Sequence, residues 1–220
     1  MKLLHSFIGK YVDIGLSGKK LPIRGCLIDV GNDILVVHNG AQFIYIPTIH
    51  LQNMTLSEDP ANNLTVKPEM PFDHSDIAYR KILMNAKGIF AEIYISGTQS
   101  VHGYVTSIMN DFFVFFSPVY RTVYVSLEHV KTITPYETNT TPYYLSQDRF
   151  PLQPTGTTLS RTFEQQLKKL IGELVVFDLG EDSNKIGRLN AVENNMLELI
   201  TANGKHLFMH TSHVKTIHIP

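Results

Sequence analysis

Cysteine and charge are both scarce in this chain of 220 residues, and each scarcity excludes a class of function. A single cysteine, Cys26, rules out an intrachain disulfide and any metal site built from several thiolates. We interpret Cys26 as a bystander that points out of a strand, with an intermolecular disulfide as the functional alternative. Charged residues make up 18% and the formal net charge is -1, so no global positive field attracts nucleic acid or an anionic membrane.

Long apolar runs and catalytic motifs are also missing. No run approaches the roughly 20 residues that cross a bilayer, and residues 1–9 are too short and too weakly apolar for a secretory signal. The sequence contains no Gly-x-Ser-x-Gly elbow, phosphate-binding loop or His-Glu-x-x-His motif. We therefore expect a chain of intracellular origin that is not an enzyme and needs no cofactor.

One pattern is present three times. Each copy has a glycine after an apolar stretch, a second glycine 15 or 16 residues later, an Asn/Asp pair, and a histidine before a branched apolar residue. The landmark residues are Gly9, Gly25 and His50 in copy one, Gly88, Gly103 and His129 in copy two, and Gly172, Gly187 and His213 in copy three. Because the copies are spaced by 79 and then 84 residues, we predict three versions of one folding unit.

Apolar residues at alternate positions after each first glycine indicate strands. The inward positions expected there are Val12, Ile14, Leu16, Ala91, Ile93, Ile95, Val175, Phe177 and Leu179. After each second glycine the apolar spacing changes from two to three, as between Leu27 and Val30, which indicates a bulge or a strong bend. On the third strand of each copy, Leu35, Phe113 and Leu197 are expected to face inward.

A short helix is expected before each first glycine. It is clearest in copy three, where Thr162 and Gln165 form a capping box and Gly172 a C-cap. Each copy then has four or five bent antiparallel strands in roughly 55 residues, a size that has to close into a small barrel to bury enough apolar surface. The predicted domains are residues 1–55, 77–133 and 162–220, joined by linkers 56–76 and 134–161.

The second linker is unusually aromatic. It contains Tyr136, Tyr143, Tyr144 and Phe150, whereas a disordered segment is normally poor in aromatic residues. We therefore expect this linker to dock on a barrel surface.

The closing segments of the copies resemble a known family. They are residues 45–54 (YIPTIHLQNM), 124–133 (YVSLEHVKTI) and 208–217 (FMHTSHVKTI). Together with the helix, the Gly-x-x-V-x-V strand and the Asn/Asp turn, they resemble the Sm-like barrel, and more narrowly the spore coat protein B-like family of Bacillus relatives. The resemblance covers about three quarters of the chain, but that family's Gly-Gly-Pro-Glu turn in the first hairpin and its long Ser/Lys-rich tail are absent.

This resemblance implies a mainly β protein of three tandem small Sm-like (SH3-like) barrels, each preceded by a short helix. It further implies a non-enzymatic structural component of the spore coat, made in the mother-cell cytoplasm and assembled with other spore coat proteins. Small open barrels also leave unpaired strand edges, so self-association through edge strands is expected. The sequence leaves open whether the three barrels satisfy one another's edges or expose two ends for polymerisation.

The alternative function is binding of single-stranded RNA, which Sm-like barrels elsewhere hold. It needs planar side chains for stacking and a cationic rim, and Lys131 and Lys215, with Tyr45, Tyr124 and Phe208, are the candidates. Copy one has Gln52 in place of the lysine, and copy three carries seven Asp/Glu against six Lys/Arg from Thr162 onward. This charge pattern favours a protein scaffold, so nucleic acid is not the expected partner.

The equivalent histidines invite a metal or catalytic role. Each is expected instead in the same turn before the last short strand, where the imidazole hydrogen-bonds the backbone and fixes the corner. His206, His210 and His213 lie close in sequence, but no carboxylate or cysteine accompanies them at ligand spacing. We therefore predict neither a metal site nor a catalytic residue, and assign acids such as Asp29 and Asp111 to turns or solvated surface.

Overall fold

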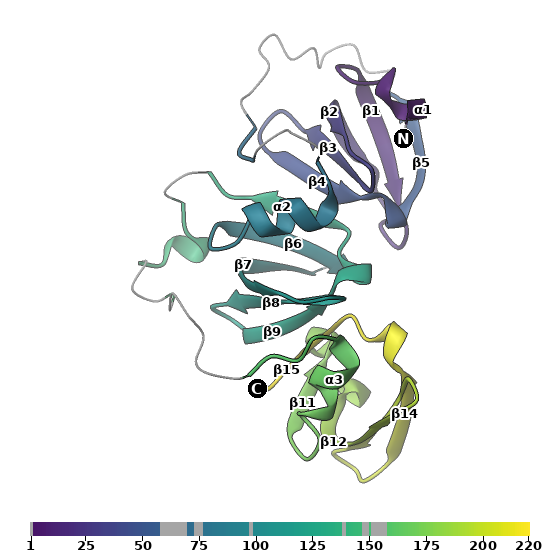
Figure 1. The fold of residues 1–220 in the computed structure, drawn as a ribbon, viewed down its shortest axis with the longest axis vertical. Helices are drawn as coiled ribbons and strands as arrows, with labels where there is room; N and C mark the ends of the chain where they lie inside the picture. Colours follow the sequence, from purple (N-terminus) through teal and green to yellow (C-terminus); the bar gives the residue numbers. More distant parts are fainter. Residues whose placement is uncertain are drawn as a thin grey trace. The chain divides into compact units, whose positions relative to one another are not determined.

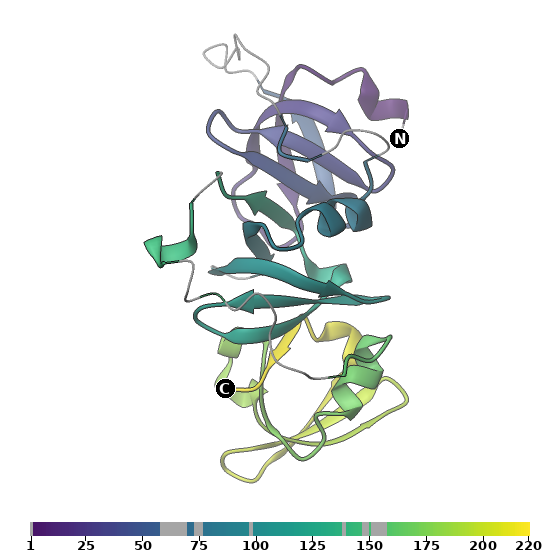
Figure 2. The ribbon, with the colours of Figure 1, turned by 60° about the vertical axis from the view of Figure 1, so that its left-hand side comes forward.

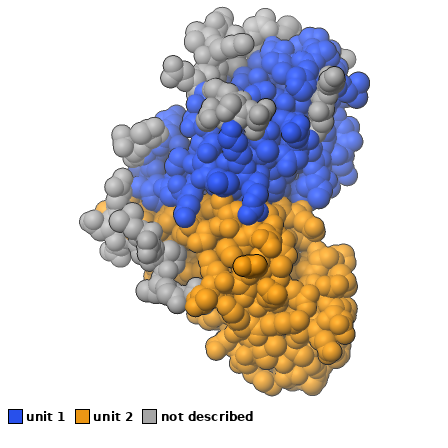
Figure 3. All heavy atoms as spheres, viewed as in Figure 1, with its two compact units in different colours: residues 1–102, 130–144 blue, residues 103–129, 145–220 orange. Residues whose placement is uncertain are grey.

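The computed structural model describes residues 2–57, 70–72, 77–96, 99–137, 140–146, 150 and 158–220. In this part of the chain the fold is mainly β, as predicted, with fifteen strands of one antiparallel sheet and few helices. No helix among these residues is long and apolar enough to cross a membrane. The chain divides into two compact units, unit 1 with residues 1–102 and 130–144 and unit 2 with residues 103–129 and 145–220 (Figure 3).

Unit 1 contains the first five strands and two strands from further along the chain (Figure 1). Its elements are α1 (Lys2–His5), β1 (Tyr11–Leu16), β2 (Ile23–Val30), β3 (Ile34–His38), β4 (Phe43–Pro47), the 3-10 helix η1 (Thr48–His50), β5 (Leu51–Leu56), α2 (Tyr79–Asn85), β6 (Phe90–Ser96), β10 (Thr132–Pro135) and η4 (Pro142–Tyr144). The strands are hydrogen-bonded in the order β6-β10-β4-β3-β2-β1-β5.

Unit 2 contains the remaining elements, and β7 (Gln99–Ile108) runs into it from unit 1. They are β8 (Phe112–Ser117), β9 (Arg121–Ser126), η3 (Leu127–His129), α3 (Phe163–Lys168), β11 (Leu174–Phe177), η6 (Asp178–Gly180), η7 (Ser183–Lys185), β12 (Ile186–Glu193), β13 (Met196–Thr201), β14 (His206–His210), η8 (Thr211–His213) and β15 (Thr216–His218). The strand order is β14-β13-β12-β11-β15-β9-β8-β7.

The alternating apolar residues build the cores, with one exception. Val12, Ile14 and Leu16 are buried at every second position of β1, and their counterparts in β6 and β11 are buried too. The exception is Leu179, which the alternation assigned to a strand. It lies in η6 with φ +59°, because the chain leaves the strand after Phe177.

The predicted bulges are present at all three positions. The register shifts between Leu27 and Asp29, between Val105 and Ser107, and between Leu189 and Ala191. A bulge adds local twist and bends the strand, and the strands at the green-to-yellow end of the colour scale are strongly curved in both views (Figure 1 and Figure 2). Beyond the bulges, Leu35, Phe113 and Leu197 are all buried, as expected.

The landmark glycines fall into two structural classes. Gly25, Gly103 and Gly187 lie where a Cβ atom would overlap the carbonyl oxygen of a residue on the adjacent strand, which is His38, Phe116 or Ile200. Gly9, Gly88 and Gly172 have φ between +76° and +96° with open space around them. The first class is required by close strand packing, and the second by backbone conformation.

The helix before Gly172 begins as predicted. Thr162 Oγ1 accepts a hydrogen bond from the Gln165 N–H at 3.4 Å. The helix ends at Lys168, so Gly172 is not its C-cap. Gly172 instead turns the chain into β11 and donates its N–H to Leu189 O at 2.8 Å.

Barrel closure and the position of Cys26 differ from expectation. Closure into separate barrels is not seen among the described strands, because β4 pairs with β3 and β10 rather than with β5. Cys26 does not point out of its strand: it is 7% exposed, so its thiol is not accessible to another chain. The domain boundaries remain predictions, since linker residues 58–69, 73–76, 138–139, 147–149 and 151–157 lie outside the described residues.

Aromatic residues of the second linker do contact the described strands. The Tyr136 hydroxyl lies 2.8 Å from His102 Nδ1, and the Tyr143 ring packs edge-on against the same imidazole. Phe150 is buried against Tyr104, whereas Tyr144 is 94% exposed. The expected docking therefore holds for three of the four aromatic residues.

Candidate functional site at the strand joints

Two strand pairings join segments that lie far apart in the sequence. In unit 1, β10 pairs with β4, with Ile133 opposite Tyr45. In unit 2, β15 pairs with β9, with Ile217 opposite Tyr124. All four side chains are at most 5% exposed. The last strand of a later copy thus docks on the fourth strand of the copy before it, with the same residue pair at the centre.

An aspartate from the Asn/Asp turn supports each joint. Asp33 Oδ1 accepts a hydrogen bond from the Tyr79 N–H at 2.7 Å, and Asp111 Oδ1 accepts one from the Phe163 N–H at 2.8 Å. Tyr79 and Phe163 are the first residues of α2 and α3, whose N–H groups have no partner within the helix. The carboxylate therefore caps the helix of the following copy. This role corrects the assignment of Asp111 to a plain turn or solvated surface.

The same turn residue holds the corner that follows the fourth strand. The backbone oxygens of Asp33, Asp111 and Asn195 accept hydrogen bonds from Thr48, Leu127 and Thr211 at 2.9, 2.9 and 2.7 Å. Each donor is the first residue of the 3-10 helix that precedes the last strand. One turn residue thus orients the corner in all three copies and, in the first two, the next helix as well.

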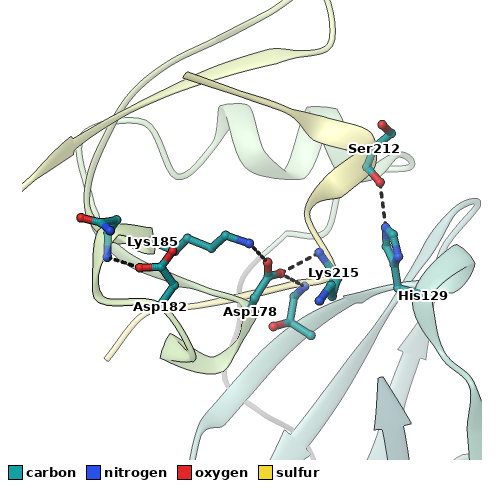
Figure 4. Close-up of polar contacts among 8 residues, drawn as sticks. His129, Asp178, Asp182, Lys185, Ser212 and Lys215 are labelled. Atoms are coloured by element: carbon teal, nitrogen blue, oxygen red, sulfur yellow. Dashed lines mark hydrogen bonds and ion pairs between the residues drawn. The ribbon is translucent and has the colours of Figure 1, made fainter. Parts of the chain in front are cut away.

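Asp178 anchors the start of β15 in unit 2 (Figure 4). Its Oδ1 accepts hydrogen bonds from the backbone N–H groups of Lys215 and Thr216 at 2.8 and 3.3 Å, and its Oδ2 forms an ion pair with Lys185 Nζ. Asp178 has φ +50° and is 5% exposed. The alternation pattern missed this residue, although the Asp178-Leu179-Gly180 sequence carries a turn signal.

The three landmark histidines end equivalent 3-10 helices but contact different partners. His50 Nδ1 lies 3.2 Å from Ser17 Oγ, and His50 O accepts the Ser17 N–H at 3.0 Å. His129 Nε2 lies 2.8 Å from Ser212 O of copy three, a backbone contact across the joint rather than within its own corner (Figure 4). The His213 ring packs edge-on against His210.

The third-copy histidine cluster is not gathered around one point. His206 Nδ1 pairs with Glu198 Oε1 on the neighbouring strand, and His210 Nδ1 contacts Ser212 Oγ at 2.6 Å. Within the described residues, no group of three or more potential ligands is arranged to hold a metal ion. A hollow of about 420 Å³ beside the unit 2 joint is lined by residues that include His210, Glu128 and Glu164.

Burial shifts the pKa values of three side chains at the joints. It raises the pKa values of the Tyr45 and Tyr124 hydroxyls. Burial lowers the pKa of His218 in β15. The joints thus consist of apolar and backbone contacts between strands, with the Asp178–Lys185 ion pair beside the unit 2 joint.

Comparison with known proteins assigns the chain to a family. Residues 162–217 match the model of the YwrJ third domain. The protein YwrJ of Bacillus subtilis (strain 168) is 42% identical over 229 aligned residues that cover 100% of both chains. Spore coat protein B of the same organism is 24% identical over 144 residues, which cover 66% of this chain and 36% of that protein. The similarity to spore coat protein B is thus partial, whereas the similarity to YwrJ spans the whole length, and the chain belongs to the YwrJ family.

Proposed function

We propose that this protein is a non-enzymatic structural component of the spore coat that acts through protein–protein assembly. The observation that carries the proposal is the repeated use of a sheet edge as a joint, with Ile133 on Tyr45 and Ile217 on Tyr124. The partial similarity to a spore coat protein supports the location. The protein is then made in the mother-cell cytoplasm and incorporated into the coat with other coat proteins as partners.

Within this proposal each copy is one Sm-like unit. The support is the strand order in which the last strand of a copy flanks its first, as in β4-β3-β2-β1-β5 and β14-β13-β12-β11-β15. In such a unit the fourth strand keeps one open edge, which receives the last strand of a neighbour. The bulges of β2, β7 and β12 supply the bend that a small barrel requires.

The proposal includes the absence of catalysis, and one side-chain contact argues against this absence. The sequence led us to expect no nucleophile beside a base at the landmark positions, yet Ser17 Oγ lies 3.2 Å from His50 Nδ1. We assign this pair to the corner, because the backbone of Ser17 also donates to His50 O. A Ser17→Ala variant is then expected to localise and assemble like the parent.

RNA binding is less well supported than assembly. Of the three aromatic candidates, Tyr45 and Tyr124 are 1% and 5% exposed, so their rings are not available to stack on bases, whereas Phe208 is 62% exposed. Lys131 is buried, and its Nζ lies 5.8 Å from the centroid of the Tyr94 ring. A net charge of -1 also provides little counterion release on binding.

The test is to express the tagged chain in Bacillus subtilis in place of YwrJ and to fractionate purified spores. Recovery in the coat extract, with no RNA retained in a filter-binding titration at about 150 mM salt, is the expected result. A tagged cytoplasmic enzyme of similar size, absent from the coat extract, serves as the control. Absence of the chain from coats together with submicromolar RNA binding would replace the proposal with the RNA-binding function.

A further inference from the structure

We propose that copies of this chain join head to tail, with β14 of one copy pairing antiparallel with β5 of the next. This inference rests on the proposed assembly function and names a second copy of the chain as a partner. It follows from the two joints inside the chain and from the two strands, β14 and β5, that end the sheet order among the described residues.

The internal joints predict the register of the external one. Tyr45 of β4 and Tyr124 of β9 receive Ile133 and Ile217. In the aligned closing segments, Phe208 of β14 takes the place of the two tyrosines and Met54 of β5 takes the place of the two isoleucines. Phe208 of one copy is therefore expected opposite Met54 of the next.

Phe208 and Met54 are more exposed than their counterparts at the internal joints. The paired tyrosines and isoleucines are at most 5% exposed, whereas Phe208 is 62% exposed and Met54 is half-buried. A large apolar side chain at the centre of a strand edge costs free energy when it is left in water. Docking of a second copy removes that cost in the same way as at the internal joints.

The backbone of β14 is oriented for a partner. Thr211 donates its N–H to Asn195 O, toward β13. Because N–H groups alternate in direction along an antiparallel strand, those of His210 and Phe208 point away from β13. The internal counterpart of His210 is Ser126, whose N–H donates to Lys215 O at 3.0 Å across the unit 2 joint. His210 is thus expected to donate to Gln52 O of the next copy.

The backbone of β5 is complementary. Ser57 donates its N–H to Tyr11 O, just as Tyr136 donates to Phe90 O at the equivalent position of copy two. The same alternation therefore directs the backbone groups of Met54 and Leu56 away from β1. Met54 then offers both a donor and an acceptor to Phe208, in the pairing that Ile133 makes with Tyr45.

Both outer strands lack two of the features that protect a sheet edge against pairing. Natural sheet edges are blunted by charged residues or proline. The sequences of β5 (LQNMTL) and β14 (HLFMH) contain no Lys, Arg, Asp, Glu or Pro. At the unit 1 joint, by contrast, β4 ends in Pro47, which has no N–H, and only one residue pair forms there against three at the unit 2 joint. The joint between copies of the chain is therefore expected to resemble the unit 2 joint, which has three residue pairs.

The two edges differ from each other, so the contact is heterologous. Such contacts propagate into open chains or close into rings, according to the rotation between successive copies. The predicted pairing of Met54 with Phe208 can be tested directly by disulfide crosslinking. Facing strand residues have the Cα separation that a disulfide needs, roughly 4.4–6.8 Å, and Cys26 is buried, so it does not compete.

Purified Met54→Cys and Phe208→Cys chains are to be mixed and oxidised. We expect a crosslinked dimer in the mixture and at least tenfold less in either variant alone, because β5 does not face β5 and β14 does not face β14. The control mixture pairs Met54→Cys with Val119→Cys, at a surface position that is 57% exposed. Equal crosslinking in the control mixture or in a single variant would overturn the inference.

A second measurement uses no cysteine. The Phe208→Lys chain is expected to sediment as a monomer at concentrations where the parent forms larger species, whereas Val119→Lys is expected to match the parent. A parent that stays monomeric at all concentrations contradicts the head-to-tail joint, while its recovery in spore coats would leave the proposed coat function intact. Crosslinking at Met54 and Phe208 in a chain absent from coats would refute the coat function alone.

Discussion

Truncation of Phe113 to alanine tests how the core was assigned. The side chain is fully buried in β8, opposite Val125 on β9 and Ile108 on β7, and its ring packs edge-on against Phe115. A phenylalanine buries at least about 150 Å², which at about 25 cal/mol per Å² corresponds to roughly 4 kcal/mol. Alanine retains part of this area and a cavity adds to the loss, so we expect destabilisation of about 3–5 kcal/mol.

The assay is urea unfolding of the full chain, with the midpoint compared at a fixed m-value. Phe208→Ala is the matched control, because it removes the same atoms from a side chain that is 62% exposed. At a protein concentration low enough to keep the chain monomeric, this control should change the stability by less than about 0.5 kcal/mol. If Phe113→Ala melted with its control, the inward face of the third strand would have been assigned backwards.

Three further predictions concern the backbone, the joint anchor and pH. Gly103→Ala should destabilise the protein more than Gly9→Ala, because a Cβ at position 103 would overlap Phe116 O. Gly9→Ala should cost only the left-handed backbone strain of about 1–2 kcal/mol. Thermal melts that rank the two variants in reverse would contradict the packing argument. Asp178→Ala should lower the free energy of unfolding by about 3 kcal/mol, because it leaves Lys185 and two backbone donors unpaired. The control Asp182→Ala removes one exposed cap and should lower it by about 1 kcal/mol. Equal losses of stability in urea titrations would argue against Asp178 as an anchor of β15. Burial lowers the pKa of His218, so below about pH 6.5 the unfolded chain binds more protons than the folded one, and stability should fall as the pH decreases. His218→Gln should flatten this dependence of stability on pH. An unchanged dependence in the variant would show that other groups cause it.

Local patterns in the sequence predicted local structure well. The bulges follow from apolar spacing between residues such as Leu27 and Val30, whereas the close packing at Gly25, Gly103 and Gly187 was not predicted. The bulges depend on neighbours within one hairpin, where periodicity carries the information. Leu179 was assigned wrongly because alternation continued past the point where Asp178 turns the chain.

The joints were beyond the reach of the sequence for a physical reason. The pairing of Ile133 with Tyr45 joins residues roughly ninety positions apart, and no local pattern specifies which edge a strand selects. The helix caps by Asp33 and Asp111 likewise connect one copy to the next. An aspartate at these positions was consistent with a turn, but the sequence did not indicate which helix it caps. Closure of each copy on itself was expected from size alone, which does not consider that a neighbouring strand can cover the edge.

The joints also set a delay during synthesis. The partner strands of β4 and β9 lie roughly ninety residues downstream, and at about 5–20 residues per second each edge waits on the order of ten seconds for its partner to leave the ribosome. An unpaired edge is a template for aggregation during that time. Pro47 at the end of β4 removes one donor from the first edge to emerge, whereas the β9 edge has no proline. Crowded ribosomes on one message would therefore expose the second edge of each nascent chain to its neighbours more than the first.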